Sequence, residues 1–214
     1  MNVAAILTGD LIGSTLASNE ALVGAMDSLA AAAETLSKWY GYNTRFTRFR
    51  GDGWQVYLDS PNHILRATLL LWASLRRSGC GLDTRLSIGV GAVEQMGGTE
   101  LSGATGAAFT LSGRNLDRMG AYQTFTYADL TGHDQWPRAV LDLASWQAGH
   151  WSREQAEAVA LALPADRPTD TELATGLGIS RQALQSRLKG SGLAAMGSAL
   201  MAFEQFYPAA EPNR

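Results

Sequence analysis

Two aspartates stand at positions where a carboxylate could take part in chemistry. Asp10 ends a continuous apolar run, and Asp52 lies between two glycines at the tip of an expected hairpin with strands at 42–50 and 54–58. Carboxylate oxygens bind Mg²⁺, which proteins commonly hold together with substrate phosphates. Two carboxylates in one cleft would therefore suit one or two magnesium ions under a triphosphate. The alternative is a solvated hairpin tip in which Asp52 serves only the turn.

Two arginines precede this tip and add to the candidate site. Side chains alternate along a strand, so Arg48, Arg50 and Asp52 would share one face if the strand runs on to the tip. A metal-bound polyphosphate would satisfy two cations and one anion placed in this way. For Arg48 the alternative is a solvated strand face or a pairing with a nearby acid.

A third candidate element follows the first apolar run. Gly13, Ser14 and Thr15 could begin the next helix, where free N–H groups attract anions. Ordinary helix capping explains Ser14 and Thr15 equally well.

The hydrophobic pattern indicates the elements that must position these residues. Alternating or continuous apolar runs predict strands, and a spacing of three to four predicts helices. The expected order is β-α-β-β-α-β-α-β, a mixed α/β (α+β) arrangement that begins with a ferredoxin-like βαββαβ unit. This unit would bring Asp10 and Asp52 together. The expected strands are 3–10, 42–50, 54–58, 85–93 and 122–127, and the expected helices are about 22–40, 61–79 and 107–119.

Four segments of this part resemble the signature blocks of class III nucleotidyl cyclase catalytic domains, in the family's order. They are residues 7–15, 48–52, 85–91 and 106–114, and the resemblance covers about residues 1–127. The compact size and the DNA-binding-type tail are also similar to the small bacterial SatD family. The resemblance implies a cyclase-type fold that binds a nucleoside triphosphate with Mg²⁺ or Mn²⁺.

The resemblance also implies roles for single residues around the metal. Asp10 and Asp52 match the two metal-binding aspartates, and Leu11 belongs to the same metal site. Arg114 matches the arginine that steadies the transition-state phosphates. In the family the aspartates and this arginine come from opposite subunits, which implies a homodimer. The alternative for Arg114 is a surface or interface salt bridge.

Base and ribose recognition depart from the family's pattern. Arg48 stands where the family has its base-selecting lysine or glutamate, and Gly103 falls near the second base-reading position. Thr110 replaces the asparagine that orients the ribose. The resemblance therefore implies retained metal chemistry with altered base specificity.

Composition narrows the function classes. The chain of 214 residues has a formal charge of −3 and a pI near 5.6, which provides no general attraction to nucleic acid or anionic membrane. One cysteine and three scattered histidines argue against a disulfide or a zinc site. No apolar run approaches the about 18 residues of a membrane span, and no signal peptide is evident, so we expect a cytoplasmic protein without a membrane partner.

The second part of the chain is expected to be helical, from 128 to 214. It contains a predicted helix at 140–148 and two capping-box patterns, at Ser152 and at Thr169. Residues 169–190 then resemble a helix-turn-helix, with Gly178 at the turn and Ser180 capping the second helix. A last apolar helix would serve as a dimer element, as a lid on the first domain or in core packing.

The second helix of this motif could contact DNA. Side chains suited to phosphates and base edges can point outward from it, at Arg181, Gln182, Gln185 and Lys189. However, residues 128–214 carry ten acids against seven bases, so a monomer should bind DNA weakly. A motif used only for packing or dimerisation is the alternative.

The sequence thus predicts a domain at 1–127 that binds a nucleoside triphosphate with Mg²⁺, joined to a helical domain at 128–214. One hypothesis is a nucleotidyl cyclase that makes a cyclic nucleotide, with Asp10, Asp52, Thr110 and Arg114 as catalytic residues. The other is a non-catalytic, nucleotide-sensing transcriptional regulator. In a third, both modules are structural relics.

Overall fold

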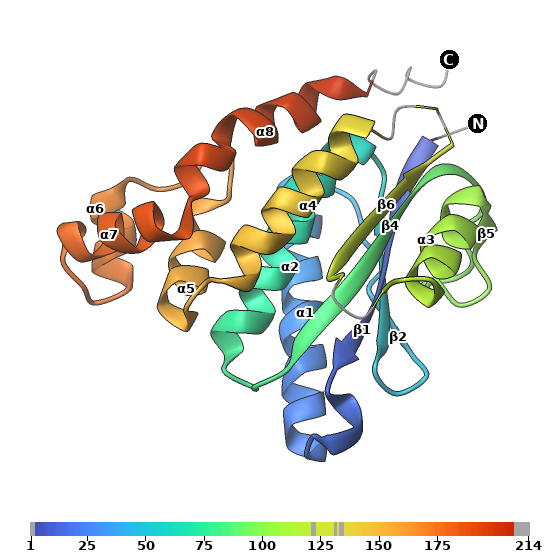
Figure 1. Cartoon of the computed structure of the whole chain (residues 1–214), viewed down its shortest axis with the longest axis horizontal. Helices are drawn as coiled ribbons and strands as arrows, with labels where there is room; N and C mark the ends of the chain where they lie inside the picture. Colours follow the sequence, from blue (N-terminus) through green and yellow to red (C-terminus); the bar gives the residue numbers. More distant parts are fainter. Residues whose placement is uncertain (1–2, 121–122, 131, 133–134, 208–214) are drawn as a thin grey trace.

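In a computed structural model of the protein, residues 3–120, 123–130, 132 and 135–207 are described (Figure 1). Within these ranges the protein is a mixed α+β structure with one six-stranded sheet and eight α-helices. Strand order is β2-β3-β1-β4-β5, and β6 pairs with β4 in parallel. No helix in these ranges is long and apolar enough to cross a membrane.

The sheet is built around β1. This strand, Val3–Ile12, pairs antiparallel with both β3, Gly53–Leu58, and β4, Asp83–Gln95. Its alternate side chains point to opposite faces. The side chains of Ala5, Leu7 and Leu11 enter the main core, whereas Thr8 and Asp10 lie on the other face of the sheet.

Helices α1, Asn19–Tyr40, and α2, Ile64–Ser78, cover the core face, and α3, Ala107–Asp117, lies on the other face (Figure 1). Close approach of α3 to the sheet requires Gly89, where a Cβ would lie 2.3 Å from the Ala108 carbonyl oxygen. The remaining strands are β2, Thr47–Phe49, β5, Thr105–Gly106, and β6, Phe125–Asp129.

Several expected boundaries are wrong. The first hairpin strand, expected from residue 42, is only Thr47–Phe49, because Arg45 takes a positive φ of 49°. The same strand does not run on to the tip, since Arg50 also has a φ of 49° and belongs to the turn. The expectation that Arg48, Arg50 and Asp52 share a strand face is therefore wrong. Strand β5 was not expected from the sequence, being only two residues long.

The expected helix start at Gly13-Ser14-Thr15 is also wrong. Residues Ser14–Leu16 form a single 3-10 turn, and α1 begins at Asn19 with Ser18 as its cap. The Ser18 hydroxyl accepts a hydrogen bond from the Ala21 N–H at 3.2 Å. A turn of three residues leaves no helix terminus to attract an anion at this point.

The described residues from Gln135 to Phe206 are mostly helical. Helix α4 spans Gln135–Gly149 and is longer than the expected 140–148, because Pro137 lies in its first turn, where a missing N–H costs nothing. The capping boxes at Ser152 and Thr169 and the cap at Ser180 are confirmed. These caps begin α5, Arg153–Ala162, α6, Asp170–Gly176, and α7, Arg181–Ser191, which are followed by α8, Leu193–Phe206.

These helices do not all pack in the same place. Leu141 of α4, Val159 of α5 and Phe203 of α8 belong to the same core as the sheet and α2. The core thus extends across the expected boundary at 127/128. Helices α6 and α7 instead contribute Leu173, Ala174 and Leu184 to a separate small core against α5, at the left of Figure 1.

Candidate functional site

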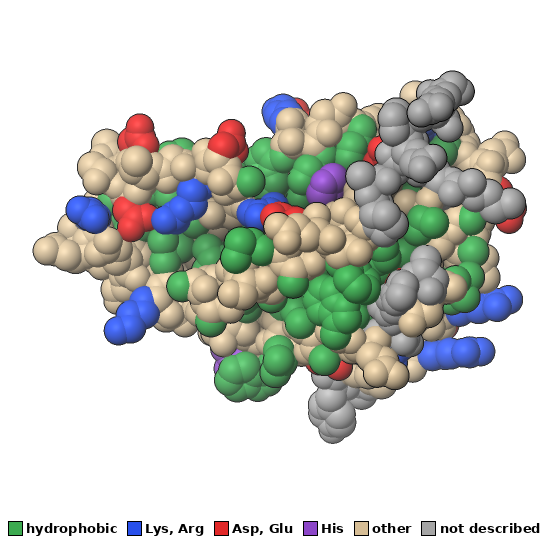
Figure 2. Space-filling model, turned by 90° about the horizontal axis from the view of Figure 1, so that it is seen from above, with side chains coloured by type: hydrophobic (Ala, Val, Ile, Leu, Met, Phe, Trp, Pro, Cys, Tyr) green, Lys and Arg blue, Asp and Glu red, His purple; other side chains and the backbone are tan. Residues whose placement is uncertain are grey.

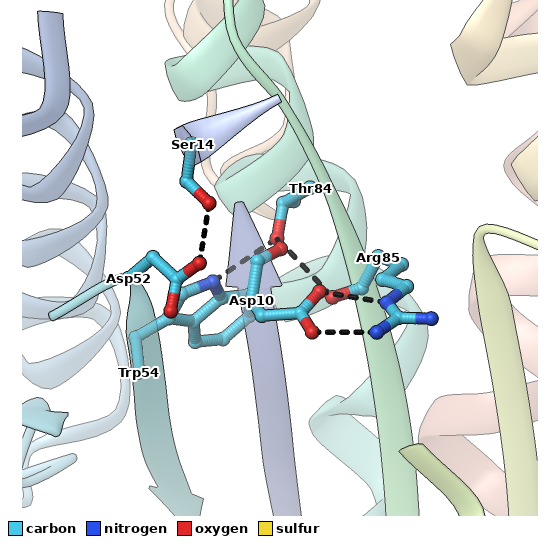
Figure 3. Close-up of polar contacts among 6 residues, drawn as sticks. All are labelled: Asp10, Ser14, Asp52, Trp54, Thr84 and Arg85. Carbon is cyan, nitrogen blue, oxygen red and sulfur yellow. Dashed lines mark hydrogen bonds and ion pairs between the residues drawn. The ribbon is translucent and has the colours of Figure 1, made fainter. Parts of the chain in front are cut away.

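Asp10 lies near the end of β1, directly opposite Arg85 of β4 in the antiparallel register. The Arg85 guanidinium donates two hydrogen bonds to it, from Nε to Oδ1 and from Nη2 to Oδ2, each at 2.8 Å (Figure 3). This is the bidentate arrangement in which a charge-assisted pair is strongest. Both oxygens of Asp10 are therefore engaged by one arginine.

Asp52 reaches the same end of the sheet from the β2–β3 tip. Its carboxylate Oδ2 accepts a hydrogen bond from the Ser14 hydroxyl at 2.5 Å (Figure 3). Its main-chain carbonyl accepts one from the Leu11 N–H at 3.2 Å. These two bonds attach the tip to the chain that follows Asp10, so the two aspartates are positioned together.

A buried tryptophan supports this end of β1 from the core face. The Trp54 ring is fully buried, and its Nε1 donates to the Thr84 hydroxyl at 3.0 Å. That hydroxyl in turn donates to the Asp10 carbonyl oxygen at 2.6 Å (Figure 3). Gly9 leaves room for the ring, because a Cβ there would lie 2.4 Å from two of its atoms.

These groups line an open pocket of about 500 Å³. Asp10 and Asp52 supply two carboxylates to it, and among the described residues that line it Arg85 is the one Lys or Arg. The other lining residues are Leu11, Ile12, Gly13, Ser14, Gln123 and Thr124.

The electrostatics of the pocket are dominated by the Asp10–Arg85 pair. The hydrogen bonds from Arg85 to Asp10 are the main cause that raises the pKa of the Arg85 guanidinium. The negative charges of Asp117 and Asp52 add to this, while partial burial opposes it. Arg85 is therefore a fixed cation among carboxylates.

The structure brings together only some of the expected site residues. Asp10, Leu11, Gly13, Ser14 and Asp52 line the pocket. Among the described residues, its lining does not include the other five that were expected to bind nucleotide or act in catalysis, which are Thr15, Arg48, Arg50, Thr110 and Arg114.

Arg48 and Arg50 lie apart from the pocket for local reasons. Arg48 pairs across the hairpin with the core residue Trp54, so it belongs to the opposite face of the sheet from Asp10. Its Nε donates to the Gly51 carbonyl at 2.8 Å, which folds the side chain over the turn. Arg50 is exposed in that turn.

Thr110 and Arg114 lie one turn apart on α3, and both are exposed. The Thr110 hydroxyl donates to the Gly106 carbonyl at 3.3 Å. Gly103, near the expected second base-reading position, lies in an exposed loop with a φ of 79°.

Sequence reasoning missed Arg85, Gln123 and Thr124. Arg85 is the first residue of the expected strand 85–93, and a charged residue at that position could have indicated a site residue. Its partner could be found only from the register that places it opposite Asp10. Gln123 and Thr124 directly precede β6, and they belong to no recognisable sequence motif.

The residues expected to contact DNA are exposed on α7, which begins at Arg181 after a turn with Gly178 at a φ of 65°. Arg181, Gln182 and Lys189 are exposed, and Gln185 donates to the Asp170 carboxylate at 3.2 Å. Figure 2 shows acidic and basic side chains mixed at the end of the molecule where α6 and α7 lie. The face seen there is not a continuous basic surface.

The donor set at Asp10 and Asp52 consists of oxygen atoms, which suit Mg²⁺ or Mn²⁺. No group of three or more His, Cys, Asp or Glu side chains that could hold a metal occurs in the described part of the chain. Two carboxylates without a complete cage fit a cation that is shared with ligand phosphates, which is the usual situation for Mg²⁺. Searches of protein-family models and of curated proteins found no match to the chain.

Proposed function

We propose that this pocket binds a nucleoside triphosphate together with Mg²⁺ or Mn²⁺, in a domain of the class III nucleotidyl cyclase type. The observation that carries the proposal is the placement of Asp10 and Asp52, from two separate segments, in the lining of one pocket. Like charges in one cleft are costly unless a cation is near. Arg85 offsets only part of this charge, so the pocket favours a ligand that brings a divalent cation.

The order of the strands supports the cyclase-type interpretation. Strands β2-β3-β1-β4 are antiparallel neighbours, and both connecting helices lie on one face. This order agrees with the one expected of a ferredoxin-like βαββαβ unit, which is part of the proposal. Asp10 lies near the end of the first strand and Asp52 lies at the tip between the second and third, which agrees with the resemblance.

Asp10 and Asp52 would hold the cation, which when bound supplies Lewis-acid activation of a ribose hydroxyl and neutralisation of phosphate charge. Thr110 and Arg114 are exposed on α3 and do not line the pocket of their own chain. A second copy of the chain would supply them in a homodimer. The proposed activity is therefore nucleotidyl cyclisation with pyrophosphate release.

The test is incubation of the purified protein with each of the four NTPs and Mg²⁺ or Mn²⁺, followed by measurement of pyrophosphate. We expect release with at least one NTP, and loss of release in Asp10→Asn and Asp52→Asn. Asp142→Asn is the matched control, because Asp142 is exposed on α4 and does not line the pocket. Release that is unchanged in both site variants would refute the proposal.

A second candidate function is a nucleotide-sensing regulator of transcription. The observation that favours it is the α6–turn–α7 unit, which has its own small core and presents Arg181 and Gln182 to solvent. This unit is of the size and connection of a helix-turn-helix. Nucleotide binding without pyrophosphate release, combined with a nucleotide-dependent shift of DNA, would favour this function over catalysis.

A further inference from the structure

Arg85 has two features that a purely structural arginine does not need. It makes a bidentate pair with Asp10, a carboxylate that the proposed function assigns to the cation. It is also the one Lys or Arg that lines the pocket in the described part of the chain. Its side chain keeps 36% of its area exposed, so the guanidinium can be reached from the pocket.

A bound cation would compete with Arg85 for Asp10, and a phosphate would compete with Asp10 for Arg85. Both oxygens of Asp10 accept hydrogen bonds from Arg85, and a divalent cation at the site would compete for the same oxygens. A guanidinium also matches phosphate oxygens as well as it matches a carboxylate, because both present two acceptors to its planar fork. A polyphosphate in the pocket would therefore offer Arg85 an equivalent partner.

We propose that Arg85 is the polyphosphate-recognising residue of this pocket, and that it exchanges its partner on binding. Without ligand Arg85 pairs with Asp10 and offsets its charge. With a metal-bound polyphosphate Arg85 pairs with the phosphate oxygens, and Asp10 is released to the cation. This inference rests on the proposed function and extends it, because it names the residue that makes the site favour cation and polyphosphate together over the cation alone.

The exchange predicts effects of opposite sign when Arg85 is removed. Asp10 loses its competitor, so Arg85→Gln should bind Mn²⁺ alone more tightly than the wild type. The phosphates lose their charge-assisted partner, so the same variant should bind Mn²⁺–tripolyphosphate about tenfold or more weakly. A merely structural arginine would instead shift both affinities in one direction, through loss of order at Asp10.

The test measures both ligands by calorimetry, with Mn²⁺ alone and with inorganic tripolyphosphate in the presence of Mn²⁺. Arg167→Gln is a matched control, because the Arg167–Asp170 pair has the same 2.8 Å distance and similar side-chain exposure but lies beside α6. Arg85→Lys keeps the charge and loses the bidentate geometry, so it should recover only part of the tripolyphosphate affinity. Melting temperatures establish that each variant is folded.

Opposite shifts in Arg85→Gln, with Arg167→Gln equal to the wild type, support the exchange. Wild-type binding of Mn²⁺–tripolyphosphate with an equal affinity in Arg85→Gln would overturn the role of Arg85 and leave the proposed site standing. A parallel loss of both affinities in Arg85→Gln would also overturn it. Failure of the wild type to bind either probe would overturn the proposed function and the inference with it.

Discussion

The contact between Gly9 and Trp54 gives the sharpest prediction about how the fold holds the site. A Cβ at Gly9 would lie 2.4 Å from Trp54 Cε2 and Cζ2 and 2.8 Å from the Arg85 carbonyl oxygen. Real side chains do not approach so closely, so Gly9→Ala must move the Trp54 ring. That ring is fully buried and bonded to Thr84, which holds the Asp10 carbonyl.

The cost has two parts. Overpacking of a buried ring typically destabilises by about 1–3 kcal/mol. Loss of the Trp54–Thr84 hydrogen bond adds about 1 kcal/mol. For a chain of this size the sum corresponds to a melting temperature lower by roughly 5–15 °C. We also expect weaker Mn²⁺–NTP binding, since Asp10 follows Gly9 directly.

Differential scanning calorimetry of Gly9→Ala measures the effect, with Gly24→Ala as the control. Gly24 lies within α1, and a Cβ there meets no atom within 4 Å. Gly24→Ala should therefore raise stability slightly, by up to about 1 kcal/mol. If Gly9→Ala melts at the wild-type temperature, the Trp54 packing described for β1 is incorrect.

Three further predictions concern the C-terminal half. Burial, together with hydrogen bonding to Asp129, raises the pKa of Tyr207. The protonated Tyr207 hydroxyl therefore contributes its whole stabilisation below the unfolded pKa near 10, and this contribution is lost as the pH rises toward the folded pKa. Tyr207→Phe should therefore cost about 1 kcal/mol in urea unfolding at pH 8 and less at pH 10.5, and an equal cost at both pH values would contradict this. Ser180→Ala removes the cap of α7, whose hydroxyl accepts from the Ala183 N–H at 3.1 Å, and should cost about 1 kcal/mol and speed amide exchange in α7, whereas Ser198→Ala on the exposed side of α8 should not. In mobility-shift assays with DNA from upstream of the protein's own gene, Arg181→Ala combined with Lys189→Ala should remove nearly all binding, and wild-type binding should depend only weakly on salt. If the wild type shifts no DNA even at low salt, α6 and α7 serve only in packing.

The order of most elements could be predicted from sequence because their signals are local. The capping boxes at Ser152 and Thr169 and the cap at Ser180 depend on residues three apart, and all three are present. The prediction of the first hairpin strand was wrong where the backbone conformation does not follow from residue type. Arg45 and Arg50 both take positive φ, which non-glycine residues rarely do.

The residues that line the pocket could be predicted from the sequence only in part. Asp10 and Asp52 were found because each has a recognisable local setting. Arg85 was not, because its role depends on pairing with a residue 75 positions earlier in the chain. Packing of the last helix on the first part of the chain was one of three alternatives for it, and the presence of Phe203 in the main core agrees with that alternative.

Asp10 and Asp52 are proposed to form one site for a metal-bound triphosphate. Calorimetric titration of the wild type, Asp10→Asn and Asp52→Asn with each of the four NTPs, in Mg²⁺ or Mn²⁺ and again in excess chelator, tests it most directly. We expect metal-dependent binding of at least one NTP to the wild type, and loss of that binding in both variants while each remains folded. Equal NTP affinity in the wild type and both variants, or binding that persists in chelator, would contradict it.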